Sequence, residues 1–212
     1  MLISKTVINM ITHRTYILAS TSSSRYNILK NAGLRFRKTK PLCNEEEIKN
    51  KICKKNKPSL VAKKLSFEKA KSVSKTKKYN NHYVIGCDTL IYLNKTIFNK
   101  AKSLKEARTK IKKLSGKKHK IVSGLTVCRK GKKVWQCSST TDVKIRKLNQ
   151  YQIDKYLKQT GSQVLSSVGC YQIESLGPNI IEDIKGDFFN VMGLPLFKLL
   201  KYVSKNKWKN FM

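Results

Sequence analysis

The run from Tyr83 to Leu93 constrains the fold of this chain more than any other segment. It reads Tyr-Val-Ile-Gly-Cys-Asp-Thr-Leu-Ile-Tyr-Leu, so it is apolar and rich in strand-forming residues except at Asp88. This pattern predicts a strand that is buried in a sheet. A carboxylate buried there without a partner would cost several kcal/mol. Asp88 therefore needs a cation, a metal or a catalytic role, unless it only caps a neighbouring loop.

The size and composition of the chain indicate a globular protein. Its 212 residues are enough for one large domain or two small ones, and 40% of them are hydrophobic, which is enough to form a core. No apolar stretch reaches the roughly 18 residues that a membrane span needs, so we expect a soluble, cytoplasmic protein without a membrane partner. The six cysteines form no CxxC pair and have no histidine-linked metal spacing, which fits a reducing compartment better than a disulfide scaffold.

The net charge of +34 raises the alternative of a nucleic-acid-binding protein. However, few of the 46 basic residues are arginine, the side chain that most often contacts bases and phosphates, and the lysines are spread along the whole chain. Lysine excess can also reflect coding bias. We interpret the charge as a general surface property and expect no specific nucleic-acid partner. The same field would still concentrate small anions near a cleft.

The sequence from residue 15 onward alternates between strand and helix patterns. A short apolar strand at 16–19 leads into Ser20–Arg25 and then into a helix that ends near Gly33. A strand that leads through hydroxyl residues into a helix presents free N–H groups and the positive end of a helix dipole. We therefore predict a phosphate site, in which Arg25 clamps the oxygens. The simpler alternative is a serine N-cap beside a surface arginine.

A second helix is predicted from Ser59 to about Val73. Val61, Leu65, Lys69 and Val73 lie four residues apart and share one face of it. Lys69 interrupts this apolar face, so its side chain either reaches along the surface to solvent or points into a cleft.

The remaining patterns predict a mixed α/β domain. We assign residues 1–14 to an N-terminal extension, residues 15–203 to a single domain and residues 204–212 to a basic tail. The extension has a basic composition, as an organelle-targeting peptide would, but it has no clear cleavage signal. The further expected elements are a hairpin turn at 94–95 with a return strand to 98, a helix opened by a capping box at 103–106 with Leu104 on its buried face, strands at 121–128 and 134–148, a helix at 149–159, strands at 170–173 and 180–184, and a final helix from Pro195.

Seven short motifs follow one another along the chain: Leu18–Arg25, Phe67–Ala70, Ile85–Thr89, Asn99–Lys100, Leu114–Gly116 with His119, Gly169–Glu174 and Gly186–Pro195. In this order they resemble the Maf family of nucleoside triphosphate pyrophosphatases, and the resemblance extends from about residue 15 to residue 203. It implies the Maf or inosine-triphosphatase-like fold, a single mixed-sheet domain with a deep cleft that is often dimeric. It also implies cleavage of a nucleoside triphosphate to a monophosphate and pyrophosphate with a divalent metal, usually Mg²⁺.

The resemblance assigns roles to individual residues. Asp88 matches the acid that serves as proton acceptor in the family. It could instead hold the metal or orient the attacking water, and the sequence does not separate these roles. Glu45 matches an acid that faces the cleft, so Glu45 and Asp88 are the candidate metal ligands. Asn44 departs from an aspartate that precedes Glu45 in the family. The phosphate-binding roles fall on Ser20, Ser22, Arg25, Lys69 and Lys100.

Three positions set the choice of base in this family, and this chain has Ser24, Thr89 and Glu174 there. Members that act on dTTP and UTP have Arg, Thr and Gln, whereas members that act on 7-methyl-GTP have an aromatic residue, Gln and Glu. Thr89 matches the first group, Glu174 the second, and Ser24 neither. We expect a pyrimidine triphosphate such as dTTP or UTP, or a modified nucleotide that the enzyme removes from the nucleotide pool, and 7-methyl-GTP is the alternative.

Two rival functions come from other classes. One is a catalytically inactive Maf-like regulator that only binds nucleotides, but the chain keeps Asp88, Lys69 and Lys100. The other is a basic nucleic-acid-binding protein, but the chain places an acid in an apolar strand and does not interleave aromatic with basic residues. Hydrolysis is the physically favoured reading, because cations around a polyphosphate supply placement and charge neutralisation.

Overall fold

A computed structural model describes residues 16–52, 57–94 and 96–207. The expected N-terminal extension and the last five residues of the expected tail lie outside these ranges. The assignment of domain boundaries therefore stays a prediction. Among the described residues, no helix is long and apolar enough to cross a membrane, and all five cysteines are free.

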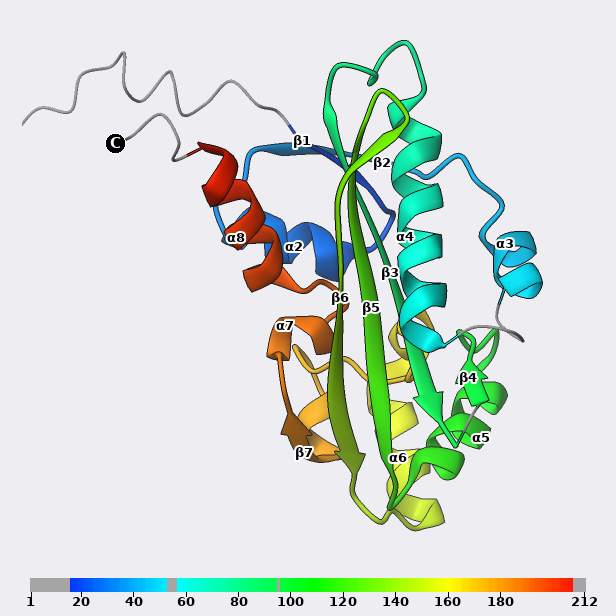
Figure 1. The fold of residues 1–212 in the computed structure, drawn as a ribbon. Coiled ribbons are helices and arrows are strands. Elements are labelled where there is room, and N and C mark those ends of the chain that lie inside the picture. The colour runs from blue at the N-terminus through cyan, green and yellow to red at the C-terminus, as the bar shows by residue number, and fades with distance from the viewer. Residues whose placement is uncertain (1–15, 53–56, 95, 208–212) are drawn as a thin grey trace, which may run out of the picture.

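A seven-stranded mixed sheet forms the centre of the described chain (Figure 1). The strands are β1 Tyr16–Ala19, β2 Phe36–Thr39, β3 Tyr83–Leu93, β4 Thr96–Phe98, β5 Lys118–Arg129, β6 Lys132–Ile145 and β7 Ile181–Lys185. Their order is β2-β1-β3-β5-β6-β7, with β4 paired to β3. β1 runs parallel to β2 and β3, and the other pairs are antiparallel. The expected mixed-sheet α/β domain is confirmed.

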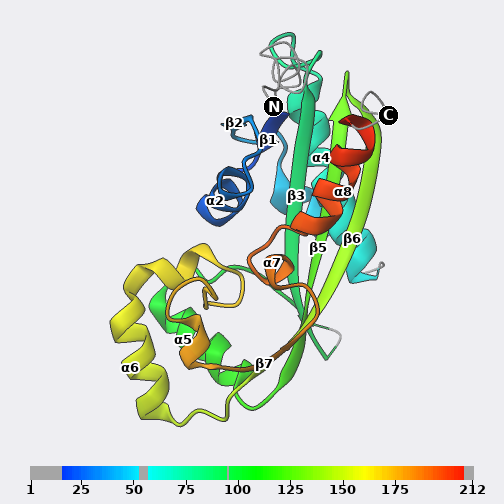
Figure 2. The ribbon, with the colours of Figure 1, turned by 90° about the vertical axis from the view of Figure 1, so that its left-hand side faces the viewer.

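Helices cover the sheet in separate groups (Figures 1 and 2). They are α2 Ser23–Asn31, α3 Glu45–Ile52, α4 Pro58–Ser74, α5 Leu104–Leu114, α6 Gln150–Thr160, α7 Phe188–Val191 and α8 Leu196–Lys207, with short 3₁₀ helices at Gly161–Ser166 and Gly177–Asn179. One apolar cluster lies where α2 and α8 pack on the sheet, and another where α5 and α6 pack on its other end. Figure 2 shows α2 and the α5–α6 pair on the same side of the molecule, at different heights.

The α4 helix lies unusually close to the sheet because glycines face it. A methyl group added at Gly86 would lie 2.2 Å from the carbonyl oxygen of Ser66, and one added at Gly124 would lie 2.2 Å from the carbonyl group of Ala62. Such distances leave no room for any larger residue. The predicted stripe of α4 faces the sheet, since Val61, Leu65, Lys69 and Val73 are all buried. Lys69 is thereby placed against β3.

Two expected details of the helices are wrong. The α4 helix begins at Pro58, not at a Ser59 cap, because proline fits the first helical position, where no N–H bond is lost. Leu104 is 43% exposed, because it stands in the first turn of α5, ahead of the buried residues Ala107, Ile111 and Leu114.

The expected strand at 170–173 is a loop, and strand β6 ends at Ile145 instead of reaching residue 148. Cys170 has a φ of +58°, in the left-handed region, which breaks the extended backbone. The N–H group of Ser175 then donates to the carbonyl oxygen of Gln172 in a turn. Cys170, Tyr171 and Ile173 are apolar because they pack into the core, not because they form a strand.

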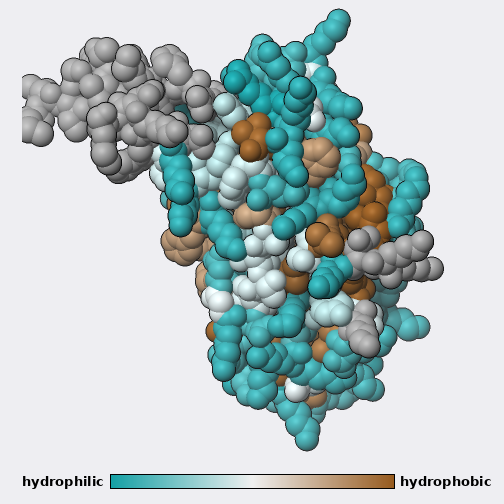
Figure 3. Space-filling view, viewed as in Figure 1, coloured by the Kyte–Doolittle hydropathy of each residue, from teal (hydrophilic) through white to brown (hydrophobic). Residues whose placement is uncertain are grey.

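The surface is strongly hydrophilic. Figure 3 shows one face of the molecule, on which hydrophilic side chains cover most of the area and hydrophobic ones lie in small groups. This agrees with a net charge of +34 that is spread over the surface.

Candidate active site

A cleft of about 750 Å³ opens beside β3, between the start of α2 and the loop 166–174. It brings together side chains that are far apart in the sequence. All ten residues that the sequence analysis proposed for the site line it: Ser20, Ser22, Ser24, Arg25, Glu45, Lys69, Asp88, Thr89, Lys100 and Glu174. Their individual roles stay predictions, but a single cavity now contains them.

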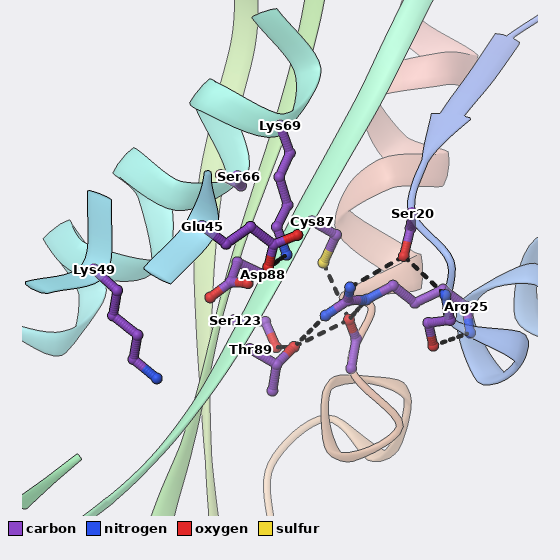
Figure 4. A network of polar contacts seen from close by, with 12 residues as sticks. Ser20, Arg25, Glu45, Lys49, Ser66, Lys69, Cys87, Asp88, Thr89 and Ser123 are labelled. Carbon is purple, nitrogen blue, oxygen red and sulfur yellow. Dashed lines mark hydrogen bonds and ion pairs between the residues drawn. The ribbon is translucent and has the colours of Figure 1, made fainter. Parts of the chain in front are cut away.

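Asp88 has a buried cation as its partner. The Lys69 Nζ atom lies 2.7 Å from Asp88 Oδ1 and 2.7 Å from Glu45 Oε2 (Figure 4). The Lys69 and Asp88 side chains are only 7% and 13% exposed. Burial alone lowers the pKa of Lys69, but the charges of Asp88 and Glu45 outweigh it, so that the net shift is upward. Lys69 is therefore a cation at neutral pH, and it points into the cleft instead of reaching out to bulk solvent.

Arg25 is held from three sides. Its Nε donates to the Gly193 carbonyl oxygen at 2.8 Å, Nη1 to Ser20 Oγ at 3.3 Å, and Nη2 to Thr89 Oγ1 at 3.0 Å (Figure 4). These contacts with described residues use three of the five guanidinium N–H donors. The guanidinium is thus fixed in orientation before any ligand arrives, and it lines the cleft with its charge.

The serine loop combines the two roles that the sequence left open. Ser22 Oγ accepts the backbone N–H of Arg25 at 3.3 Å, so Ser22 is the N-cap of α2. Ser20 Oγ accepts the N–H of Ser22 at 3.2 Å, which tightens the turn. The same residues therefore cap the helix and line the cavity, because the start of α2 forms part of the cleft wall.

Thr89 was proposed to take part in the choice of base, but its hydroxyl group bonds to Arg25 and the residues around it. Besides Arg25, its Oγ1 contacts Ser123 Oγ at 2.9 Å and the Gly193 carbonyl oxygen at 3.2 Å. Cys87 Sγ also donates to this carbonyl, at 3.0 Å. Sequence reasoning missed Ser123, Gly193 and Cys87 as supports of Arg25. Of these residues, only Gly193 lies in a recognisable local pattern, the Gly-Leu-Pro turn at 193–195. That pattern does not indicate that the Gly193 carbonyl binds Arg25.

Ser24 and Glu174 meet at the mouth of the cleft. The Ser24 hydroxyl donates to Glu174 Oε1 at 2.5 Å, across 150 positions of sequence. The bond connects the first turn of α2 with the loop 166–174. Two of the three positions assigned to base choice are therefore neighbours in space.

Lys100 lines the cleft from the loop after β4. Burial against the cleft wall lowers its pKa, and the nearby charges of Arg25 and Lys69 lower it further, although Glu45 and Asp88 act in the opposite direction. An anionic ligand would offset the repulsion among Arg25, Lys69 and Lys100 and so raise the pKa of Lys100 again. No hydrogen bond or ion pair within the described ranges engages the Lys100 side chain, so its ammonium group is available for a ligand.

Two carboxylates could hold a metal here. Glu45 and Asp88 both bind the Lys69 ammonium group and so face a common point. The structure shows no cluster of three or more His, Cys, Asp or Glu side chains in the part of the chain that it describes. Mg²⁺ commonly binds through one or two carboxylates, substrate phosphates and water. The donor set therefore fits a metal that shares phosphate oxygens with the substrate. Asn44 has a neutral amide and contributes no charge, and its Oδ1 accepts the N–H of Glu47 at the start of α3.

Comparisons with known proteins point to one family. A family model described as Maf-like protein matches residues 15–206. A 7-methyl-GTP pyrophosphatase of Bartonella quintana is 42% identical over 186 residues, which cover 88% of this chain and 92% of the relative. A nucleoside triphosphate pyrophosphatase of Caulobacter vibrioides is 37% identical over 187 residues, with 88% and 92% covered. A 7-methyl-GTP pyrophosphatase of Brucella abortus is 35% identical over 192 residues, with 90% and 96% covered.

Proposed function

The chain belongs to the Maf-like protein family and is a nucleoside triphosphate pyrophosphatase, and from this premise we propose that its substrate is 7-methyl-GTP, which it cleaves to 7-methyl-GMP and pyrophosphate. The observation that carries this choice is the carboxylate of Glu174, which the Ser24 hydroxyl holds at the mouth of the cleft. The choice replaces our expectation of dTTP or UTP with the alternative that the sequence left open.

The chemistry of Glu174 favours a guanine base. A carboxylate only accepts hydrogen bonds, and guanine offers it two neighbouring donors, the ring N1–H and the 2-amino group. Uracil and thymine offer only one, at N3. A site that is built to accept two donors discriminates against a base that supplies one.

The expectation of a pyrimidine rested mainly on Thr89, and the contacts of this residue weaken it. The Thr89 hydroxyl accepts from Arg25 and contacts Ser123 and the Gly193 carbonyl, so its bonding capacity is already used. These contacts favour a role for Thr89 in supporting Arg25 over a role in contacting the base. The names of the relatives from Bartonella quintana and Brucella abortus agree with the same choice.

The cations of the cleft would hold the triphosphate. Arg25, Lys69 and Lys100 come from three different elements and line one cavity, together with the N–H groups at the start of α2. Catalysis of phosphoryl transfer depends mainly on such placement and charge neutralisation. Asp88 would accept the proton of the attacking water. Mg²⁺ would be held by Glu45 and Asp88 and would supply Lewis acidity to the phosphate oxygens when bound.

A change of one atom in Glu174 tests the choice of base. Glu174→Gln replaces one acceptor oxygen by an amide, so we expect kcat/KM for 7-methyl-GTP to fall roughly tenfold relative to kcat/KM for UTP. Glu182→Gln is the matched control, because Glu182 is an exposed residue of β7 whose ion pair with Lys144 lies outside the cleft. An unchanged ratio in Glu174→Gln would show that this carboxylate does not read the base.

A further inference from the structure

The cleft wall that carries Glu174 has no regular secondary structure to hold it. The loop 166–174 lines the cavity along most of its length. Side chains must therefore fix it in place. Two tyrosines do so, and one of them leads to a buried histidine that the proposed mechanism does not use.

His119 of β5 forms the link between this loop and the sheet. Its Nε2 atom lies 2.5 Å from the hydroxyl oxygen of Tyr171, and the two side chains belong to residues that are 1% and 5% exposed. The rings lie 5.8 Å apart at a tilted angle. The contact spans 52 positions of sequence and joins the loop to the central sheet.

The Tyr171 ring in turn sets the shape of the loop backbone. A methyl group added at Gly169 would lie only 2.4 Å from Tyr171 Cε1, so the chain folds tightly over the ring. Between these two residues, Cys170 adopts its left-handed conformation, with a φ of +58°. The Tyr156 hydroxyl donates to the Cys170 carbonyl oxygen at 3.3 Å as a second anchor. Glu174 follows three residues after Tyr171 in the same loop.

Packing alone does not explain a histidine at this position. Burial lowers the pKa of His119 to about 4, with Asp142 opposing that shift, so the imidazole is neutral at physiological pH. Its Nδ1 atom is buried and has no hydrogen-bond partner among the described residues. An apolar side chain would avoid the cost of that unpaired nitrogen. The bond to Tyr171 is what the imidazole adds.

We propose that His119 is a positioning residue for the nucleobase, which acts through Tyr171 to hold the loop 166–174 so that Glu174 stays opposite Ser24. This inference rests on the proposed function, because it assumes that Glu174 contacts the base. It goes further in assigning base recognition to a side chain that itself lines no part of the cleft.

The test separates positioning from general stability. Tyr171→Phe keeps the ring and removes only the hydroxyl, and His119→Leu removes the other partner. We expect each to raise KM for 7-methyl-GTP roughly tenfold while kcat stays within about twofold, and to lower the preference for 7-methyl-GTP over UTP. The double variant should show no larger change than either single one, because the same bond is lost. His119→Gln keeps a group that can bond to Tyr171 and should restore most of the parent KM.

Ser74→Ala is the matched control. Its buried hydroxyl accepts from the N–H of Gly131 at 3.2 Å at the far end of α4, outside the cleft. It should lower stability and leave KM unchanged.

The proposal is overturned if Tyr171→Phe and His119→Leu keep the parent KM and base preference, or if Ser74→Ala raises KM as much as they do. The nucleotide preference of the parent protein tests the proposed function separately. If it prefers another nucleotide, the proposed substrate is wrong, and the same comparison of KM and kcat with that nucleotide still decides the role of His119.

Discussion

Burial and neighbouring charges have opposite effects on Lys69 in this cleft. It is buried, which disfavours its charge, and it is bound by Asp88 and Glu45 at 2.7 Å each, which restores that charge. A buried pair that loses one partner is strongly destabilised. Asp88 is thus stable in the free protein only because Lys69 neutralises it. An incoming triphosphate would compete for the same ammonium group, and Asp88 would then be released for catalysis.

The role of Asp88 can be tested with the smallest change of side chain. In Asp88→Asn the amide cannot accept a proton or carry a charge, so we expect kcat to fall about 10²-fold or more. Binding of a non-hydrolysable nucleotide analogue should change little, because Arg25 and Lys100 remain. Steady-state kinetics and titration with the analogue measure the two quantities.

Asp154→Asn serves as the control for Asp88→Asn. Asp154 pairs with Arg108 on the exposed surface and should have parent kinetics. If Asp88→Asn retained the parent kcat, Asp88 would have only its structural role as the partner of Lys69.

At the scale of elements, local sequence patterns predicted those parts of the fold that depend on local interactions. The β3 strand, the buried stripe of α4 and the serine-capped start of α2 follow from periodicity and capping. The strand expected at 170–173 failed because its apolar residues are explained by contacts with β5 and α6, which a local pattern does not contain. The bond from Arg25 to Gly193 spans 168 positions, and neither segment contains a pattern that identifies the other as its partner.

The contact between β5 and the loop 166–174 also predicts how stability depends on pH. The pKa of His119 is lowered to about 4, below its ordinary value of about 6.5, mainly by burial. As the pH falls from about 6.5 towards 4, the unfolded chain binds a proton that the folded chain does not, so the folded state loses stability. At pH 4 this loss of stability amounts to about 3 kcal/mol.

Urea unfolding between pH 7 and pH 4 measures this contribution. The parent protein should lose stability over the window more steeply than His119→Gln, which has no group that titrates there, while the carboxylates contribute equally to both. Parallel curves for the two proteins would contradict the low pKa of His119.

At the scale of the whole molecule, the excess of positive charge is not confined to the cleft. The 46 basic residues are spread along the whole chain, whereas the cleft lining combines cations with four carboxylates, those of Glu45, Glu46, Asp88 and Glu174. Composition predicted an attraction for anions, local motifs predicted the residues that would bind a phosphate, and the fold brings these residues into one cavity. The homodimer implied by the family resemblance stays a prediction.

This distribution of charge leads to a prediction for polymers. We expect duplex DNA to bind weakly and without sequence preference, with an affinity that falls at least about tenfold between 50 and 200 mM salt, because only phosphate contacts contribute. Fluorescence anisotropy with two unrelated duplexes checks both points. Tight, sequence-selective binding at physiological salt would favour the nucleic-acid-binding alternative instead.

Product analysis over a panel of nucleotides tests the central claim most directly. The purified protein with Mg²⁺ is given 7-methyl-GTP, GTP, UTP and dTTP, and the first products are separated and quantified. We expect pyrophosphate and a nucleoside monophosphate in equal amounts, with the highest kcat/KM for 7-methyl-GTP. Release of orthophosphate as the first product, or no turnover of any nucleotide, would contradict it and favour a nucleotide-binding regulator.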